Sequence, residues 1–402
     1  MTSNRRVLWP LQALNFFMAD LQAGIGPFLG IFLLAHGWKS GLIGSVMTIG
    51  GVAGMLMTVP AGALIDATSR KRMYVVLSAI FTAIASAIIL FSQNFWLVSI
   101  SQVATAIAGS VIGPAVMGIT LGIARQAGFN RQNGHNQAFN HAGNVAGAAL
   151  SGWLGFRYGM PAIFLLAAFF GVLSIVSVLL IPGKAIDDRV ARGLEDAGDG
   201  GSKVSGLKVL VECKPLLILA AALAFFHLGN GAMLPLYGMA AAGHHQGDAA
   251  LFVAMTIVIA QLVMVVASLV AMRMADKRGY WMVILISFLA LPVRGMIAAH
   301  WINHTGLYPV QILDGLGAGL QSVAVPGLVA RILNGTGRIN IGQGAVMTVQ
   351  GLGASLSPAI GGWIAQGIGY PLTFLLLGSF ALLSILVWVL YSKALKAACD
   401  RP

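Results

Sequence analysis

The sequence predicts an all-α membrane protein of about twelve transmembrane helices, arranged as two pseudo-symmetric six-helix bundles. Three observations predict it: charged residues make up only 9% of the 402 residues, apolar stretches recur along the whole chain, and the two halves repeat. A soluble domain carries about 25% charged residues, which it needs to cover its surface. A chain with so little charge cannot cover a soluble fold of this size.

Each apolar stretch is long enough to cross a hydrocarbon core of roughly 30 Å as a helix. The stretch 73–91, for example, contains no charged residue. Glycine, with 51 residues, is frequent within these stretches, and in a membrane bundle it allows two helix backbones to approach closely. The predicted spans are 7–34, 41–64, 73–92, 95–123, 136–156, 161–182, 215–240, 249–272, 280–300, 307–332, 340–366 and 371–391.

The net charge of +12 follows membrane topology and does not indicate a nucleic-acid partner. If both termini lie in the cytoplasm, 21 of the 24 Lys and Arg residues fall in cytoplasmic segments, as the positive-inside rule requires. The exceptions are Lys39, Arg157 and Arg294. We therefore expect a multi-pass protein of the cell inner membrane with both termini cytoplasmic.

One long hydrophilic segment divides the chain nearly in half. It covers 183–214 and mixes acidic with basic residues and glycine, which is typical of a flexible linker. The predicted domains are an N-terminal six-helix bundle (1–182), a cytoplasmic linker (183–214) and a C-terminal six-helix bundle (215–402).

The halves repeat at a nearly constant offset of about 210 residues, which indicates a duplicated six-span unit. The matching pairs are Asp66 and Asp276, Gly143 and Gly353, Gly152-Trp153 and Gly362-Trp363, Pro161 and Pro371, and, at an offset of 212, Pro114 and Pro326. The alignment at 212 also sets Gln102 opposite Asp314.

The loop after the second span carries a basic and acidic motif, Gly62-Ala63-Leu64-Ile65-Asp66-Ala67-Thr68-Ser69-Arg70-Lys71-Arg72. It resembles the signature of the major facilitator superfamily, with Ser69 in place of the usual glycine and Ala67 in place of a frequent basic residue. A fainter copy follows span eight at Asp276-Lys277-Arg278-Gly279. The resemblance implies two six-helix bundles that expose a central site alternately to the two sides of the membrane.

The resemblance also implies a gating role for this loop. A carboxylate at a helix end beside a basic cluster can hold two helices together on one side of the membrane, and its release favours the opposite-facing state. The expected gating residues are Gly62, Asp66, Arg70, Lys71 and Asp276. The alternative is that these charges only fix the topology.

Span five resembles the glycine-rich motif of proton-driven exporters. It reads Gly143-Asn144-Val145-Ala146-Gly147-Ala148, where the family motif has a Gly-Pro pair in place of Gly147-Ala148. Glycine spacing of this kind also serves ordinary helix packing.

Charged side chains within a bilayer cost about 2.5–3.5 kcal/mol on insertion scales, so each is a candidate functional residue. Asp20 in span one is the first candidate for a proton carrier, because desolvation favours the neutral carboxyl. The alternative is a hydrogen-bonded structural aspartate.

Asp314 and Arg294, on consecutive spans, could form an ion pair with a coupling or a structural role. His227 is a further proton-coupling candidate or a packing residue.

Polar and aromatic residues of several spans are expected to line the substrate cavity. They are Phe17, Gln102, Asn140, His141, Asn144 and Gln350. The amides and the imidazole suit a polar path, and the alternative is that they form interhelical hydrogen bonds worth about 0.6 kcal/mol each. Phe17 could equally pack against neighbouring helices.

The expected function is secondary active transport of a small molecule by alternating access, coupled to protons in the direction of export. Proton-coupled uptake of a nutrient, siderophore or other metabolite is the alternative, and a non-transporting membrane receptor belongs to another class. The chain has no Walker-type phosphate loop, no nucleophile–base arrangement and no metal-ligand spacing, so we expect no enzyme activity, cofactor or metal. We expect a monomer in the lipid bilayer, with protons and a small molecule as partners.

Overall fold

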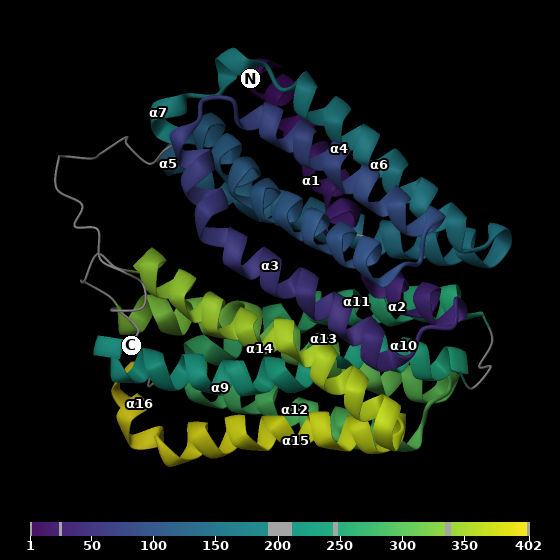
Figure 1. The fold of residues 1–402 in the computed structure, drawn as a ribbon. Helices are drawn as coiled ribbons and strands as arrows, with labels where there is room; N and C mark the ends of the chain where they lie inside the picture. The colour runs from purple at the N-terminus through teal and green to yellow at the C-terminus, as the bar shows by residue number, and fades with distance from the viewer. Residues whose placement is uncertain (1, 24–25, 192–210, 244–247, 334–338, 400–402) are drawn as a thin grey trace. The chain divides into compact units, whose positions relative to one another are not determined.

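In the computed structural model, every regular element of the described residues is a helix (Figure 1). The structure describes residues 2–23, 26–191, 211–243, 248–333 and 339–399. Within these ranges, nine helices are long and apolar enough to cross a membrane, and shorter apolar helices occupy the first predicted span. The prediction of an all-α membrane fold is confirmed.

The helices follow the predicted spans in order. They are α1 (Thr2–Ala23), α2 (Gly26–Ala35), α3 (Ser40–Ala67), α4 (Lys71–Phe91), α5 (Phe95–Tyr158), α6 (Met160–Leu180), the 3₁₀ turn η1 (Gly183–Ala185), α7 (Asp188–Ala191), α9 (Lys214–Asn230), α10 (Met233–Gly243), α11 (Ala249–Arg278), α12 (Tyr280–His300), α13 (His304–Ile332), α14 (Ile339–Ile368), α15 (Tyr370–Leu390) and α16 (Ser392–Cys399).

The helix boundaries depart from the predicted spans in three places. The first span contains α1 and α2, and the seventh contains α9 and α10. Spans four and five join in the single element α5, which is interrupted at Arg125, where φ is 56° and ψ is 174°. A non-glycine residue at positive φ is uncommon, and it reverses the chain direction here without an intervening loop. The predicted spans end at 123 and resume at 136, so the apolar pattern placed this turn, but it predicted a loop and not a break at one residue.

Contacts divide the chain into two compact units. The first contains Met1–Phe32 and Ile49–Ser202, and the second contains Leu33–Thr48 and Lys203–Pro402. In the first unit α5 packs against α1, α4 and α6, and in the second α9 packs against α14 and α15 while α13 packs against α11 and α12.

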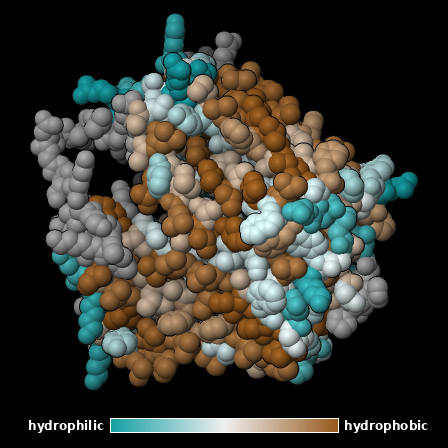
Figure 2. All heavy atoms as spheres, viewed as in Figure 1, coloured by the Kyte–Doolittle hydropathy of each residue, from teal (hydrophilic) through white to brown (hydrophobic). Residues whose placement is uncertain are grey.

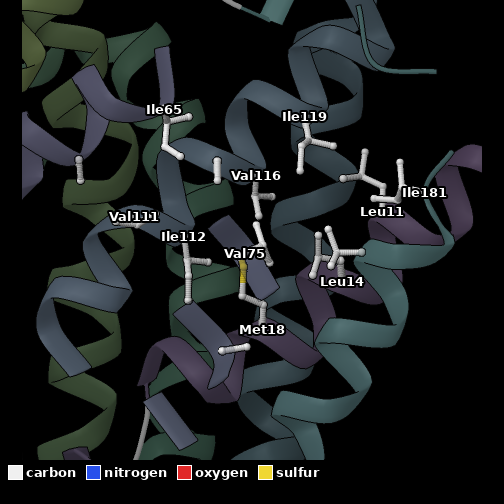
Figure 3. Packing of buried hydrophobic residues seen from close by; sticks show 14 residues of the cluster. Leu11, Leu14, Met18, Ile65, Val75, Val111, Ile112, Val116, Ile119 and Ile181 are labelled. Atoms are coloured by element: carbon white, nitrogen blue, oxygen red, sulfur yellow. The ribbon is translucent and has the colours of Figure 1, made fainter. Parts of the chain in front are cut away.

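A hydrophobic cluster holds the first unit together (Figure 3). Leu11, Leu14 and Met18 of α1 lie in this cluster with Val75 of α4 and Ile112 of α5, and all five are at most 3% exposed. On the outer surfaces of the helices, by contrast, many large apolar side chains are exposed. Hydrophobic side chains cover much of the face drawn in Figure 2, as expected for a surface that faces lipid.

The internal repeat reappears in the local geometry of each unit. Gly159 precedes α6 with φ 83° and ψ 172°, and Gly369 precedes α15 with φ 84° and ψ 163°. A proline, Pro161 or Pro371, then occupies the first turn of each helix, where its missing N–H costs no hydrogen bond. Only glycine adopts this left-handed conformation without strain, so the same residue pair makes the same corner twice.

The glycines of spans five and eleven also act in the same way in each unit. A Cβ atom at Gly143 would collide with the backbone oxygen of Phe16 in α1, and one at Gly353 would collide with that of Ala224 in α9. Since lipid gives helices little hydrophobic reason to associate, such close backbone contact is a main source of packing energy. The glycine-rich pattern of these spans therefore serves helix packing in both units.

The segment Leu33–Thr48 groups with the second unit through hydrogen bonds to α14. Ser40 Oγ donates to the Gly362 carbonyl at 3.0 Å, and the Ala359 N–H donates to Thr48 Oγ1 at 2.9 Å. Trp363 Nε1 donates to Ser45 Oγ at 2.9 Å. Gly362 lies against the Ser40 backbone, where a side chain would not fit.

We predict opposite effects for the same substitution at two positions of α14. Gly353→Ala forces the α9 backbone away and should lower stability by about 1–3 kcal/mol, the usual cost of overpacking. Gly344→Ala, the control, adds a methyl group to open space and should leave stability unchanged or raise it by up to about 1 kcal/mol through helix propensity. Thermal unfolding of the detergent-purified proteins measures both. Equal melting temperatures for the two variants would contradict the close contact.

Candidate functional site

A buried ion pair lies at the centre of the candidate site, within the second unit. Arg294 of α12 is 1% exposed, and its Nη1 atom donates to Asp314 Oδ1 of α13 at 2.6 Å. The same Nη1 donates to Asn230 Oδ1 of α9 at 2.6 Å. The structure thus brings together the two charged residues that the sequence suggested as a pair, and it adds Asn230 from a third helix.

The ion pair leaves several buried polar atoms without a partner among the described residues. These are Arg294 Nε and Nη2 and both side-chain polar atoms of Gln311, one helical turn before Asp314 on α13. Gln311 is fully buried. Unpartnered buried polar groups are costly, so they occur mainly where a site rearranges, is hydrated or binds a ligand.

A second group of buried polar side chains lies on the same three helices, displaced from the ion pair along the helix axes. Gln321 Nε2 of α13 donates to Ser287 Oγ of α12 at 3.3 Å, and His227 of α9 lies close to Gln321. Ser287 and Gln321 each lie seven residues from the ion-paired residue of their helix, which is about 10 Å along the axis. His227 lies only one turn from Asn230, and its Nε2 atom is buried with no hydrogen-bond partner in the described part of the chain.

The polar stripe predicted in span five lies at the contact of α5 with α1. Asn144 Nδ2 donates to Asn140 Oδ1 at 3.2 Å, and Asn140 Nδ2 donates to the Asn15 carbonyl at 3.4 Å. Earlier on α5, Gln132 Nε2 donates to Asn136 Oδ1, and Asn136 Nδ2 donates to Thr120 Oγ1, each at 2.9 Å. Asn140 and Asn144 thus make hydrogen bonds within and between helices, the alternative that the sequence left open.

The other predicted cavity residues lie on α1, α5 and α14 and are partly buried. They are Phe17, Gln102, His141 and Gln350. Phe17 packs edge-on against Phe16 and Phe170, with ring centroids 5.2 and 5.6 Å apart. The Gln102 Cβ lies 3.1 Å from the position that a Cβ of Gly50 would take.

The predicted gating residues are dispersed over the two units. Arg70 is exposed at the N-terminus of α4, Gly62 lies on α3 with open space beside it, and Asp276 is exposed in the last turn of α11. Lys71 differs, because it is 1% exposed. Its Nζ atom donates to the Thr68 carbonyl at 2.8 Å and lies 4.0 Å from Asp188 Oδ1.

Two predicted residues cannot be compared with the structure. Asp20 falls in α1 and Asp66 in α3, and the side chains of both lie outside the described part of the chain. Their proposed roles as proton carrier and gate therefore stay predictions.

Comparison with known proteins identifies the chain. A family model described as Major Facilitator Superfamily matches residues 8–333. The chain belongs to the major facilitator superfamily. Two relatives from Mycobacterium tuberculosis, the uncharacterized MFS-type transporters MT2531 of strain CDC 1551 and Rv2456c of strain H37Rv, are each 40% identical over 379 residues. The match covers 94% of this chain and 90% of each relative. The protein is a multi-pass membrane transporter and not an enzyme.

Solved transporters share the fold of this chain at low identity. The nucleoside transporter NupG has a TM-score of 0.79 at 14% identity, over 96% of this chain and 99% of that one. A bacterial homolog of the human lysosomal transporter Spinster has a TM-score of 0.76 at 13% identity, over 99% of both chains. A POT family transporter in complex with a thioalcohol-conjugated peptide has a TM-score of 0.75 at 14% identity, over 96% of both chains.

Sequence reasoning missed Asn230 and Gln311. A helical signal could have found them, because Asn230 lies three residues after His227 and Gln311 three residues before Asp314. Residues three or four apart share one face of a helix, so each amide extends a polar face that the ionisable residue already marked.

We predict that Asp314→Asn destabilises this transporter and that adding Arg294→Gln restores most of the loss. The single variant leaves a buried guanidinium without its counter-ion, and breaking such a pair costs about 3–5 kcal/mol at full burial. Because Asp314 is 18% exposed, we expect a loss of stability near the lower end of this range. Thermal unfolding in detergent measures the change.

Asp248→Asn is the matched control, because Asp248 caps α11 by accepting from the Leu251 N–H at 2.9 Å and asparagine caps helices equally well. A double variant less stable than Asp314→Asn alone would contradict a net electrostatic role for the pair.

Proposed function

We propose that this transporter exports a small molecule across the cell inner membrane by alternating access, driven by protons, with Asp314 and Arg294 as a coupling pair. The observation that carries the proposal is the 2.6 Å contact of a guanidinium that is 1% exposed with one carboxylate. Asp20 is the second proton-carrier candidate of the proposal, and His227 of α9 is the third.

The coupling argument follows from the charge balance of the pair. Protonation of Asp314 removes the counter-ion of Arg294, and an uncompensated charge in the interior is strongly unfavourable. The second unit must then rearrange or recruit another acceptor before the proton is stable there. A proton that is favourable in only one conformation shifts the balance between conformations, which is the requirement for coupled transport.

The proposed substrate is neutral, amphipathic or weakly charged. Few ionisable residues lie within the predicted spans, and Arg294 already has a counter-ion. Amides and aromatic rings therefore dominate the predicted cavity residues, among them Phe17, Gln102 and Gln350. NupG is a nucleoside transporter and the POT family structure holds a peptide, so this fold serves chemically different substrates and does not select one here.

The proposed orientation places both termini in the cytoplasm, because the positive-inside rule assigns 21 of 24 basic residues to that side. The direction of export rests on the resemblance of span five to the glycine-rich motif of proton-driven exporters. Proton-coupled uptake of a nutrient or other metabolite is the second candidate function, and it uses the same coupling pair.

Accumulation of a broad compound panel in cells tests the direction and the coupling together. We expect cells with the wild-type transporter to accumulate less of at least one compound than cells without it, and an uncoupler to abolish the difference. Asp314→Asn and Asp20→Asn should abolish it as well at equal expression, whereas the control Asp248→Asn should not. Higher accumulation in wild-type cells would establish uptake, and an uncoupler-resistant difference would exclude proton coupling.

We further propose that Asp66 and Arg70 gate the transition between the two facing states, as the motif after span two implies. Asp66→Asn should lower the transport rate of the compound found above while surface expression stays constant. An unchanged rate would leave the motif a topology anchor only.

A further inference from the structure

A cavity of about 330 Å³ lies in the first unit, where α4 begins and α6 ends. It combines residues of the motif after span two with residues of the segment that follows span six. The lining residues are Ser69, Arg70, Arg72, Met73, Val76, Leu179, Gly183, Ile186 and Asp188. None of these belongs to the ion-pair site of the second unit.

One wall of this cavity is cationic and held in place. Arg72 Nη1 donates to the Ile181 carbonyl at 2.7 Å, which orients the guanidinium at the end of α6. Gly183 leaves room for that guanidinium, because a Cβ there would lie 2.6 Å from Arg72 Nη2. Arg70, exposed on the same wall, adds a second guanidinium.

The lining contains one carboxylate, that of Asp188, and a buried lysine partly balances its negative charge. Asp188 Oδ1 lies 4.0 Å from the Nζ atom of buried Lys71. The lining itself carries two guanidinium groups, those of Arg70 and Arg72, and one carboxylate, so its net positive charge favours an anion. Guanidinium groups bind phosphate oxygens with paired hydrogen bonds, which suits this wall to a phosphate group.

The opposite wall is apolar and continues onto the membrane surface of the unit. Met73 and Leu179 are 45% and 59% exposed, and Val76 and Ile186 line the cavity between them. Both α4 and α6 are apolar enough to span a membrane, so these side chains meet acyl chains. A free phosphate ion would leave this wall unused, whereas a lipid would occupy both walls.

We propose that this cavity binds an anionic membrane phospholipid. The phosphate lies against Arg70 and Arg72, and an acyl chain lies along Met73, Val76 and Leu179. The positive-inside rule places the cavity at the cytoplasmic surface, where anionic lipids bind basic pockets between transmembrane helices. The lipid would join α4 to α6 and to the turn η1 that follows it.

Native mass spectrometry of the full-length protein with added phosphatidylglycerol tests the proposal. Each arginine is expected to contribute about 5-fold in affinity, so Arg70→Gln with Arg72→Gln should weaken binding by about 25-fold. The matched control is Lys277→Gln with Arg278→Gln, an exposed basic pair at the end of α11, which should leave this affinity unchanged. Equal loss in the two double variants, or no loss in either, would overturn the proposal.

A second variant separates lipid binding from folding, since Arg72 also bonds to the Ile181 carbonyl. Val76→Phe fills the cavity and keeps every charge, and it too should weaken phosphatidylglycerol binding. Phosphatidylcholine should bind the wild type at least 10-fold more weakly than phosphatidylglycerol, as expected if the net charge of the lipid decides. Unchanged binding to Val76→Phe, equal binding of phosphatidylcholine, or displacement of phosphatidylglycerol by millimolar inorganic phosphate would each contradict a lipid site.

Discussion

The absence of water in the bilayer core is the constraint on which this structure depends. Every backbone N–H and C=O group there must find a partner within the chain, and helices satisfy them within each span. Because lipid is as apolar as the helix surfaces, close packing has to hold the helices together. The contacts of Gly143 with the Phe16 backbone and of Gly353 with the Ala224 backbone meet this need, since any side chain at either glycine would separate two helices.

The same constraint explains why the polar groups concentrate in few places. In the second unit a single guanidinium links α9, α12 and α13 through Asn230 and Asp314. In the first unit, polar contacts within α5 and with α1 use neutral amides, as between Asn140 and Asn144. Among the described residues, the ion pair of the second unit therefore contrasts with the neutral amide contacts between α5 and α1 in the first unit, where Lys71 is the buried charged side chain.

The order of helices and the Arg294–Asp314 pair were predictable from sequence, because apolar length and rare intramembrane charge are strong signals. The apolar pattern placed a turn between 123 and 136. It did not show that the turn is a break at the single residue Arg125, because a positive φ at a non-glycine residue has no signature in that pattern. Asn230 and Gln311 were missed because amides, unlike charges, are common enough in spans to pass unnoticed. The order of Gly183–Ala191 was missed too: the segment reads as linker, yet the Asp187 N–H donates to the Gly122 carbonyl at 3.1 Å, and its carboxylate lies 3.2 Å from the Arg125 guanidinium.

The paired corners at Gly159 and Gly369 have an evolutionary consequence. Their dihedral angles agree within 10°, although the spans around them have diverged. Side chains in a lipid-facing span exchange freely for others of similar polarity, whereas a left-handed corner followed by proline admits almost no exchange. Both corners lie between the fifth and sixth spans of their half, so they mark the register of the six-helix repeat by backbone conformation, independently of the sequence of the helices around them.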